Sequence, residues 1–407
     1  MRGNIIKRIF KQYEYKILHK RILFTILILL IYILGSHVPI ISAHAMKHQG
    51  NGFYRLAVSN MGGDISRLNV FSLGLGPWLT ALLIISLWSY KNIEKSMRQT
   101  RAEKHFKEKF LTLILSIVQG CFVLNQFVYH SHLKQSNALL LLLILIAGSM
   151  MLVWLADQNV RNGVAGPMPI VMLSIVRSIF NQHGPKLNIE TYEIIIVTVL
   201  IVAALFTLLL IELIEYRTKY QDILDVSKEN TVNYLAWKLN PGGSLSIMIS
   251  LSVFLLLNST LNLALSLTIG QTAHIKIFSF DNYIGISTYL LIQIVLGYFL
   301  SRLMINTKQN SKNFLKNGNY FIGVRPGKET SAYLNRMATR ICWFGTFIVG
   351  IIIGIPLYCS LFIPHLSQQI YLAVQLIILV YIAINIADTF RTYLYFDKYQ
   401  HVLKQYW

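Results

Sequence analysis

The stretch from Gly323 to Thr330, which reads GVRPGKET, carries residue types that could bind a phosphate: two glycines, an arginine and a lysine. A nucleotide-binding loop has the pattern G-x-x-x-x-G-K-[ST], in which backbone N–H groups surround the phosphates and the hydroxyl after the lysine reaches Mg²⁺. Here only three residues separate the glycines, and Glu329 stands where the hydroxyl is needed. A carboxylate there repels a phosphate, so the stretch is not a nucleotide-binding loop. Any ATP used with this protein must then be bound by another protein.

No other motif predicts an enzyme. The sequence has neither the H-E-x-x-H pattern of a zinc protease nor the G-x-S-x-G pattern of a nucleophilic hydrolase. The cysteines Cys121, Cys342 and Cys359 are far apart, and we interpret them as small core residues rather than as a disulfide or a metal site. We expect no catalytic site, no metal and no cofactor.

Acidic residues near the predicted spans bear on a second class, the secondary transporters of small solutes. Such a transporter needs ionisable groups deep in the membrane to couple ion flow to transport. The candidate acids all stand at the ends of predicted helices, where water is close: Asp157, Glu212, Glu215 and Asp388. The transporter is therefore the weaker hypothesis, and a membrane enzyme is weaker still.

The composition indicates a membrane protein. Of the 407 residues, 54% are hydrophobic and 13% are charged, whereas soluble domains carry about 25% charged residues. A spanning helix needs roughly 20 mostly apolar residues. Ten stretches qualify, at about 22–42, 71–90, 110–129, 137–156, 164–181, 193–214, 245–266, 283–305, 341–363 and 369–388. The fifth is weakened by Pro167 and Pro169, and the seventh by many Ser and Asn residues.

The charge distribution predicts the orientation of these spans. The net charge is +20, and with a cytoplasmic N-terminus 30 of the 37 Lys and Arg residues fall in cytoplasmic segments. This asymmetry follows the positive-inside rule and predicts that both termini are cytoplasmic. The basic charge therefore reports topology, and a nucleic-acid partner is not needed to explain it. The first apolar run exceeds the length of a signal-peptide core, so we expect no cleaved signal.

Five stretches occur in an order typical of one known family. They are KRILFTILILLIYILGSHVP (20–39), SRLNVFSLGLGPW (66–78), WLADQ with Gly163 (154–163), KLNPGG (238–243) and GVRPGKET with Tyr333 and Leu334 after it. Together they resemble the SecY family of protein-conducting channels, from about residue 20 to 400. The resemblance implies an all-α membrane protein, with ten transmembrane helices in two pseudo-symmetric five-helix halves around a central hourglass pore.

The resemblance also implies a domain organisation. It comprises a cytoplasmic N-terminal segment (1–21), an N-terminal half (22–183) with an outer plug at about 53–68, and an outer hinge loop (184–192). A C-terminal half (193–390) carries cytoplasmic loops 215–240 and 302–340 and is followed by a cytoplasmic tail (391–407).

Site residues carried over from the family fall into three groups. The pore ring is expected at Leu75, Leu79, Met168, Met172, Met248 and Ile386. The plug is expected to include Gly62, Gly63 and Asp64. The docking loop for a cytosolic partner is expected at Gly323, Arg325, Pro326, Gly327 and Lys328. The alternatives are ordinary apolar packing for the ring, an ordinary outer loop for the plug, and a solvated basic loop for the docking residues.

The function implied by the resemblance is that of a translocase channel. It conducts unfolded secretory polypeptides across the bacterial plasma membrane, driven by a docked SecA-like motor ATPase and accompanied by a small SecE-like membrane subunit. Two prolines after Gly163, a ring rich in Leu and Met, and a short loop between helices six and seven resemble the accessory Sec branch of Gram-positive bacteria. That branch works with further accessory Sec proteins and exports serine-rich glycosylated adhesins. The housekeeping channel for general secretion and membrane insertion is the alternative.

Overall fold

The structure is a computed structural model. It describes residues 14–40, 57–63, 69–91, 99–131, 138–181, 191–223, 233–269, 282–362 and 367–405. The chain forms two compact units. The first comprises Met1–Leu187, Ser252–Ile275 and Ile378–Trp407, and the second comprises Asn188–Leu251 and Lys276–Ile377. Two long helices, α10 (Gly243–Ile269) and α14 (Ser367–Gln405), contribute to both units.

Each of the ten predicted spans coincides with a helix of the described residues. Besides α10 and α14 these are α2 (Glu14–Ser36), α4 (Gly76–Lys91), α6 (Arg101–Ser131), α7 (Ala138–Asn162), α8 (Met168–Asn181), α9 (Thr191–Leu213), α11 (Tyr283–Ile305) and α13 (Lys328–Phe362). In the described part of the chain, six helices are long and apolar enough to cross a membrane, namely α2, α7, α10, α11, α13 and α14. The helices α4 and α8 are shorter but apolar, and in α9 the stretch Thr198–Leu213 is apolar. The prediction of an all-α membrane protein is confirmed.

Several helices extend beyond the apolar stretches that predicted them. The helix α13 starts at Lys328, 13 residues before the expected span at 341, and α14 runs on to Gln405. Hydropathy detects only the apolar part of a helix, while the i to i−4 backbone hydrogen bonds can continue into polar sequence beyond it. Residues 391–405 of the expected tail (391–407) are therefore helical.

The fifth span begins later than predicted. The helix α8 starts at Met168 rather than at 164, because Ala165 and Gly166 have φ values of +58° and +56°, outside the right-handed helical region. Pro169 then falls in the first turn, where the missing backbone N–H costs no helical hydrogen bond. The two prolines thus belong to a defined helix start.

Asn159, near the end of α7, holds the turn before α8. Its amide nitrogen donates to the carbonyl oxygens of Val164 (3.0 Å) and Gly166 (2.6 Å), and its side-chain oxygen accepts from Thr25 Oγ1 of α2 (2.9 Å). The Thr25 hydroxyl also accepts from the backbone N–H of Val164 at 3.0 Å. Asn159 is fully buried, so all these groups depend on protein partners.

We expect Asn159→Ala to lower the stability of the first unit markedly. Removing the side chain leaves the carbonyl oxygens of Val164 and Gly166 without this donor in a buried place, at a cost of about 3 kcal/mol. Thermal unfolding in detergent measures the effect. Asn162→Ala, at an exposed position of the same helix, is the matched control. Equal unfolding midpoints for the two variants would contradict the role given to Asn159.

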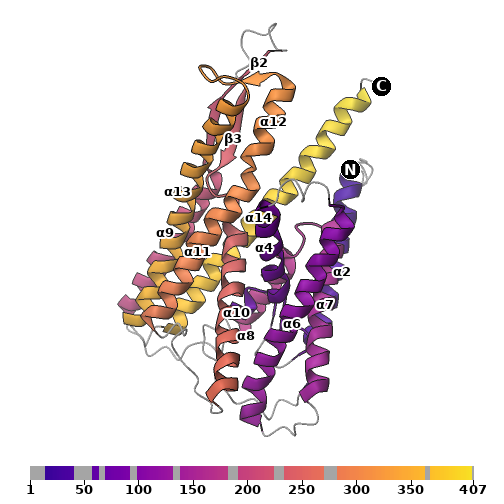
Figure 1. The fold of residues 1–407 in the computed structure, drawn as a ribbon. Coiled ribbons are helices and arrows are strands. Elements are labelled where there is room, and N and C mark those ends of the chain that lie inside the picture. Colours follow the sequence, from indigo (N-terminus) through magenta and orange to yellow (C-terminus); the bar gives the residue numbers. More distant parts are fainter. Residues whose placement is uncertain are drawn as a thin grey trace, which may run out of the picture. The chain divides into compact units, whose positions relative to one another are not determined.

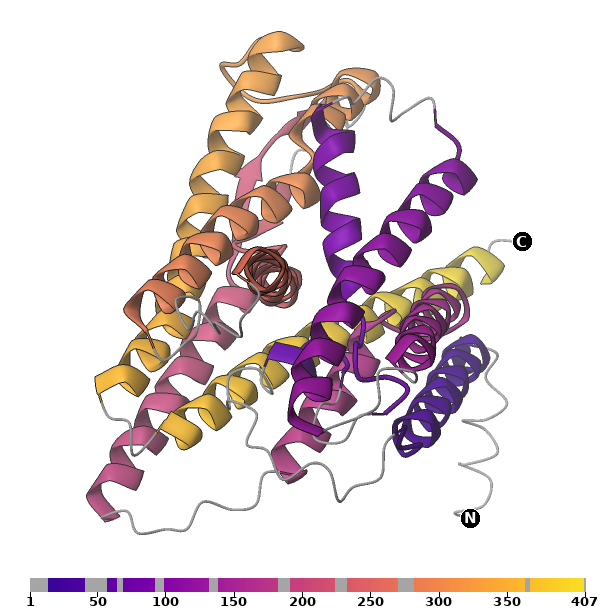
Figure 2. The same cartoon turned by 60° about the horizontal axis from the view of Figure 1, so that its bottom comes forward.

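Helix packing in the first unit follows the order of the chain from α4 to α7, whereas α2 packs against later helices. The helix α4 packs on α6, α6 on α7, and α2 contacts both α7 and α8. Figure 2 shows α2 and α7 side by side. Arg21 adds a polar link in this unit, because Nη1 donates to Gly163 O (3.1 Å) and to the Tyr393 hydroxyl (3.0 Å) of α14.

Helices α11 and α13 pack against each other in the second unit and continue into a small domain of strands. The strand β1 (Glu215–Lys219) pairs antiparallel with β3 (Tyr234–Lys238), and β2 (Gln221–Asp222) pairs with β4 (Asn319–Tyr320). A short helix, α12 (Thr307–Asn317), packs on α13. These elements gather at one end of α11 and α13 (Figure 1).

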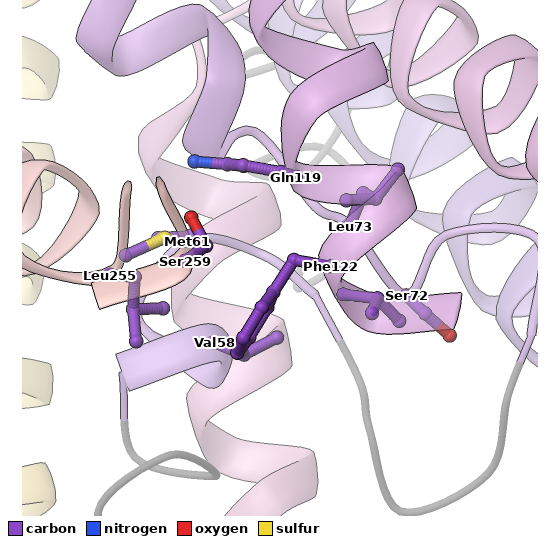
Figure 3. Close-up of a pocket in the computed structure, with 9 residues that line it drawn as sticks. Val58, Met61, Ser72, Leu73, Gln119, Phe122, Leu255 and Ser259 are labelled. Carbon is purple, nitrogen blue, oxygen red and sulfur yellow. The ribbon is translucent and has the colours of Figure 1, made fainter. Parts of the chain in front are cut away.

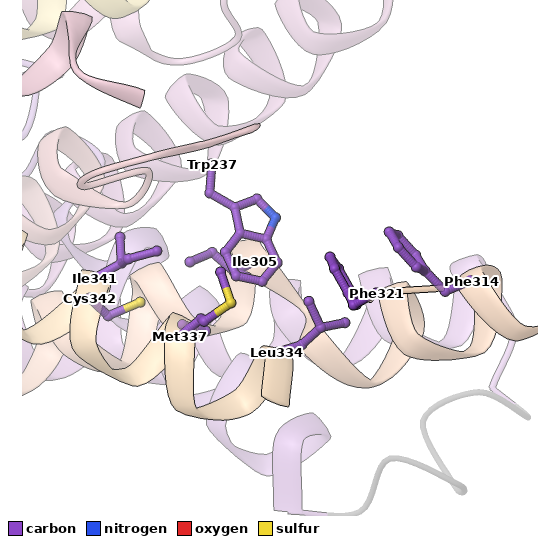
Figure 4. Close-up of a cluster of buried hydrophobic side chains, with 9 residues drawn as sticks. Trp237, Ile305, Phe314, Phe321, Leu334, Met337, Ile341 and Cys342 are labelled. Atoms are coloured by element: carbon purple, nitrogen blue, oxygen red, sulfur yellow. The ribbon is translucent and has the colours of Figure 1, made fainter. Parts of the chain in front are cut away.

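A hydrophobic cluster forms the core of this small domain. Its buried members are Trp237, Ile305, Phe314, Phe321, Leu334, Met337, Ala338, Ile341 and Cys342. Trp237 from β3 lies over Met337 and Ile305, while Phe314 and Phe321 stack with ring centroids 5.1 Å apart (Figure 4). Burial of these large side chains supplies the main stabilisation of the domain. The loop between α9 and α10 and the loop between α11 and α13 both contribute to this core. They are thereby held together as one small domain.

Candidate functional site

The GVRPGKET turn lies at the edge of the hydrophobic cluster. Gly323 and Gly327 have φ values of +79° and +106°, which side-chain-bearing residues rarely adopt, and both lie in open space. Arg325, Pro326 and Lys328 are exposed. The turn therefore presents two cations to solvent on a backbone that requires glycine.

Glu329 has a structural place in this turn. Its carboxylate accepts a hydrogen bond from the backbone N–H of Arg325 at 3.2 Å, and Thr330 Oγ1 donates to the Arg325 carbonyl at 2.9 Å. Glu329 also lies in the first turn of α13, where a negative charge is favourable. The residue that ruled out a phosphate site thus helps to fix the conformation of Arg325.

The loop between α9 and α10 belongs to the same small domain, to which it contributes β1, β2 and β3. Tyr320 of β4 donates from its hydroxyl to Gln221 Oε1 of β2 at 2.6 Å. The sequence did not predict this pairing. Two-residue strands carry no hydrophobic period of their own, so their pairing depends on the tertiary structure.

Leu75 and Leu79, two expected pore residues, are fully buried, at 0% and 2% exposure. The helix α4 begins at Gly76, and Leu79 lies one turn into it. Met168 and Met172, at the start of α8, are half-buried. Ile386 on α14 is half-buried in the first unit, whereas Met248 on α10 is fully buried in the second. Their common role as a ring stays a prediction.

The structure describes the central part of the expected plug, residues 57–63, which we call the plug segment. Asp64 and the rest of the expected range 53–68 lie outside the described residues. All seven residues of the plug segment are buried. The backbone N–H of Leu75 donates to the Met61 carbonyl at 2.7 Å. A Cβ placed on Gly62 would lie 3.8 Å from Leu75 Cδ1 and 3.5 Å from Ile170 Cγ2, so the segment is in contact with the expected pore residues.

A small cavity of about 30 Å³ lies beside the plug segment. Met61 lies beside Leu255 and Ser259 of α10, and Val58 lies beside Phe122 of α6 (Figure 3). All these residues belong to the first unit. A space of this size holds about one water molecule, so the plug segment fills its place in this unit closely.

The four acids considered for a transporter all have basic partners. Asp157 pairs with His105 (3.2 Å) and Lys109 (3.1 Å) of α6. The other three pairs are Glu212 with Lys238, Glu215 with Arg217 and Asp388 with Arg391, at 2.8, 3.2 and 3.8 Å. In the described part of the chain no cluster of His, Cys, Asp or Glu could hold a metal ion.

Comparison with solved structures defines the class of fold. The chain superimposes on the structure of a protein conducting channel with a TM-score of 0.70 and 14% sequence identity, covering 92% of each chain. It also superimposes on Sec61 from the canine ribosome–channel complex with a TM-score of 0.66 and 14% identity, again over 92% of each chain. At these identities the match establishes the fold.

The family model of SecY matches residues 69–387, and the chain belongs to the SecY family. A relative from Staphylococcus pseudintermedius, named accessory Sec system protein translocase subunit SecY2, is 62% identical over 407 residues, with 100% of both chains covered. Relatives of the same name from Staphylococcus epidermidis and Staphylococcus aureus are 51% and 53% identical, each covering 98% of this chain and 100% of the relative. The resemblance to the accessory branch is confirmed.

Proposed function

We propose that this protein is the central channel subunit of an accessory Sec translocase in a bacterial plasma membrane, with both termini in the cytoplasm. The observation that carries the proposal is the 62% identity over the whole chain to a relative named as such a subunit. Buried packing of the plug segment on Leu75 and the exposed basic turn at Arg325 support it. A protein-conducting pore needs a closure and a place for its motor, and these two features can supply them.

In this mechanism the protein itself is passive. A SecA-like motor ATPase docks through the basic turn and drives an unfolded polypeptide past the apolar side chains of the ring. Those side chains exclude water and ions when no polypeptide is present, because an apolar constriction empties of water. A small SecE-like membrane subunit and further accessory Sec proteins are the expected partners, and serine-rich glycosylated adhesins are the expected substrates.

Two alternatives have less support. A housekeeping channel would be expected to resemble general-secretion relatives, whereas the full-length matches described above carry the accessory name. A solute transporter needs acids that can exchange protons or ions, and the four candidates are engaged in ion pairs.

Site-specific crosslinking in cells tests the proposal. A photoreactive residue replaces Leu79, and a matched probe replaces Leu145, which is buried in α7, a helix that carries no expected ring residue. A stalled adhesin should crosslink at position 79 and not at 145. Crosslinks at 79 to general secretory precursors would favour the housekeeping channel. No crosslink to any polypeptide, with the motor active, would favour the transporter.

A further inference from the structure

Three successive carbonyl groups at the end of the plug segment each accept a hydrogen bond from a different element. The Met61 carbonyl accepts from the backbone N–H of Leu75, at the start of α4 (2.7 Å). The Gly62 carbonyl accepts from the hydroxyl of Tyr32 on α2 (2.9 Å), and the Gly63 carbonyl accepts from Ser174 Oγ on α8 (2.8 Å). Two of these three bonds therefore come from side chains of neighbouring helices.

Both side-chain bonds are shielded from water. Tyr32 is 1% exposed and Ser174 is 2% exposed, and the plug segment itself is buried. A buried carbonyl that loses its donor in such a place has no water to replace it. The two bonds thus favour the position of the plug segment in which both donors are within reach.

The Ser174 hydroxyl donates outside its own helix, as Ser252 of α10 does to the Gly76 carbonyl, whereas many other serines of the apolar helices bond locally. Ser86 and Ser116, for example, donate to the carbonyls of Leu82 and Thr112 in their own helices. This intrahelical bond is the usual local solution for a serine in an apolar helix. Ser174 instead donates to Gly63, 111 residues away in the chain.

Tyr32 is placed by its own packing. Its ring stacks on that of Phe71 with centroids 5.8 Å apart and an angle of 10° between the planes. The backbone around its acceptor is equally constrained, because Gly62 has φ = +78°, and a side chain on Gly63 would collide with the Ser72 carbonyl. Glycine at these positions lets the donors approach the backbone closely.

We propose that Tyr32 and Ser174 are positioning residues that hold the plug segment closed, and we call their two hydrogen bonds the latch. This inference rests on the proposed function, in which the plug segment seals the idle channel. Because the two donors stand on separate helices, a shift of either α2 or α8 breaks one bond and weakens the closure. The latch therefore makes plug release depend on the position of both helices.

Variants that each delete one oxygen test the latch. Tyr32→Phe keeps the ring that stacks on Phe71, and Ser174→Ala keeps the helix. The idle ion conductance of the reconstituted channel should rise about fivefold for each variant and by roughly the product for the double variant. Ser174→Thr retains a hydroxyl and should restore the seal that Ser174→Ala loses.

Two hydroxyl deletions elsewhere serve as matched controls. Tyr358→Phe removes a hydroxyl that pairs with Ser287 at an exposed position, and Ser149→Ala removes a buried hydroxyl bonded to Ser116. Neither should change the idle conductance. A second readout is the labelling rate of Val58→Cys by a membrane-impermeant thiol reagent, with Cys121, Cys342 and Cys359 replaced by serine. Val58 is 6% exposed, so labelling should accelerate only in the latch variants.

The outcomes separate the latch from the channel itself. A double variant that neither leaks nor labels faster, beside a Leu79→Ala channel that does leak, would overturn the latch and leave the proposed function standing. If Leu79→Ala does not leak either, the plug and pore assignments on which the latch depends fail with it. Faster labelling together with increased conductance in the latch variants, and in neither of the two control variants Tyr358→Phe and Ser149→Ala, supports the latch.

Discussion

Arg325→Glu is expected to abolish docking of the motor ATPase and stop export, while the channel folds as before. Arg325 is exposed at the tip of the GVRPGKET turn, and its backbone is held by Glu329 and Thr330. A guanidinium in a fixed position can form two charge-assisted hydrogen bonds to one carboxylate of a partner. Reversal of the charge turns that attraction into repulsion, with an expected loss of motor affinity of roughly 30- to 100-fold.

The measurement is motor binding to the channel in proteoliposomes, together with export in cells. Lys316→Glu is the control, because Lys316 is an exposed base on α12 of the same domain and the charge change is identical. Lys316→Glu should retain most of the binding. If Arg325→Glu exports normally, or if both variants lose the same affinity, the turn is an ordinary basic surface.

Leu79→Ala should make the idle channel conduct ions. Leu79 is 2% exposed and lies one helical turn from Leu75, which contacts the plug segment. Truncation of a buried leucine costs about 2–5 kcal/mol and leaves a cavity. If about 1.4 kcal/mol of this loss falls on the closed state alone, the open fraction rises about tenfold.

Planar-bilayer conductance without motor or substrate measures this leak. Leu145→Ala is the matched control, because Leu145 is 0% exposed and lies on α7, a helix that carries no expected ring residue. Both variants should lose comparable stability, and only Leu79→Ala should conduct. A leak of the same size in both variants would show that the conductance follows the general loss of stability of the protein. Leu79 would then have no specific role in the pore.

The membrane class and the number of helices were predictable because each depends on local chemistry. Lipid demands apolar side chains and internally bonded backbone over the whole span, so hydropathy marks each helix. The ends of the helices were less predictable. Hydropathy could not show that α13 starts at Lys328 or that Ala165 and Gly166 delay the start of α8, because these limits depend on turn geometry.

The candidate site was predictable in part. The GVRPGKET turn predicted Arg325 as a site residue, and the family motifs predicted Leu75 and Leu79. The structure adds that Arg325 is exposed and that the two leucines are buried. It does not test their roles. Tyr32 and Ser174 carried no signal, since hydroxyls are common in apolar helices and usually bond within their own helix.

The sequence by itself determined the membrane class, the ten spans and the family, because these follow from composition and contiguous motifs. The orientation stays a prediction from the placement of charge. Only the tertiary structure decided which distant groups meet. It shows that Ser174 donates a hydrogen bond to the Gly63 carbonyl and that Tyr320 donates one to the Gln221 side chain. It also shows that the Glu329 carboxylate accepts a hydrogen bond from the backbone N–H of Arg325. Such contacts require close approach of segments far apart in the chain, and hydrogen bonds depend on distance and direction that residue types alone do not specify.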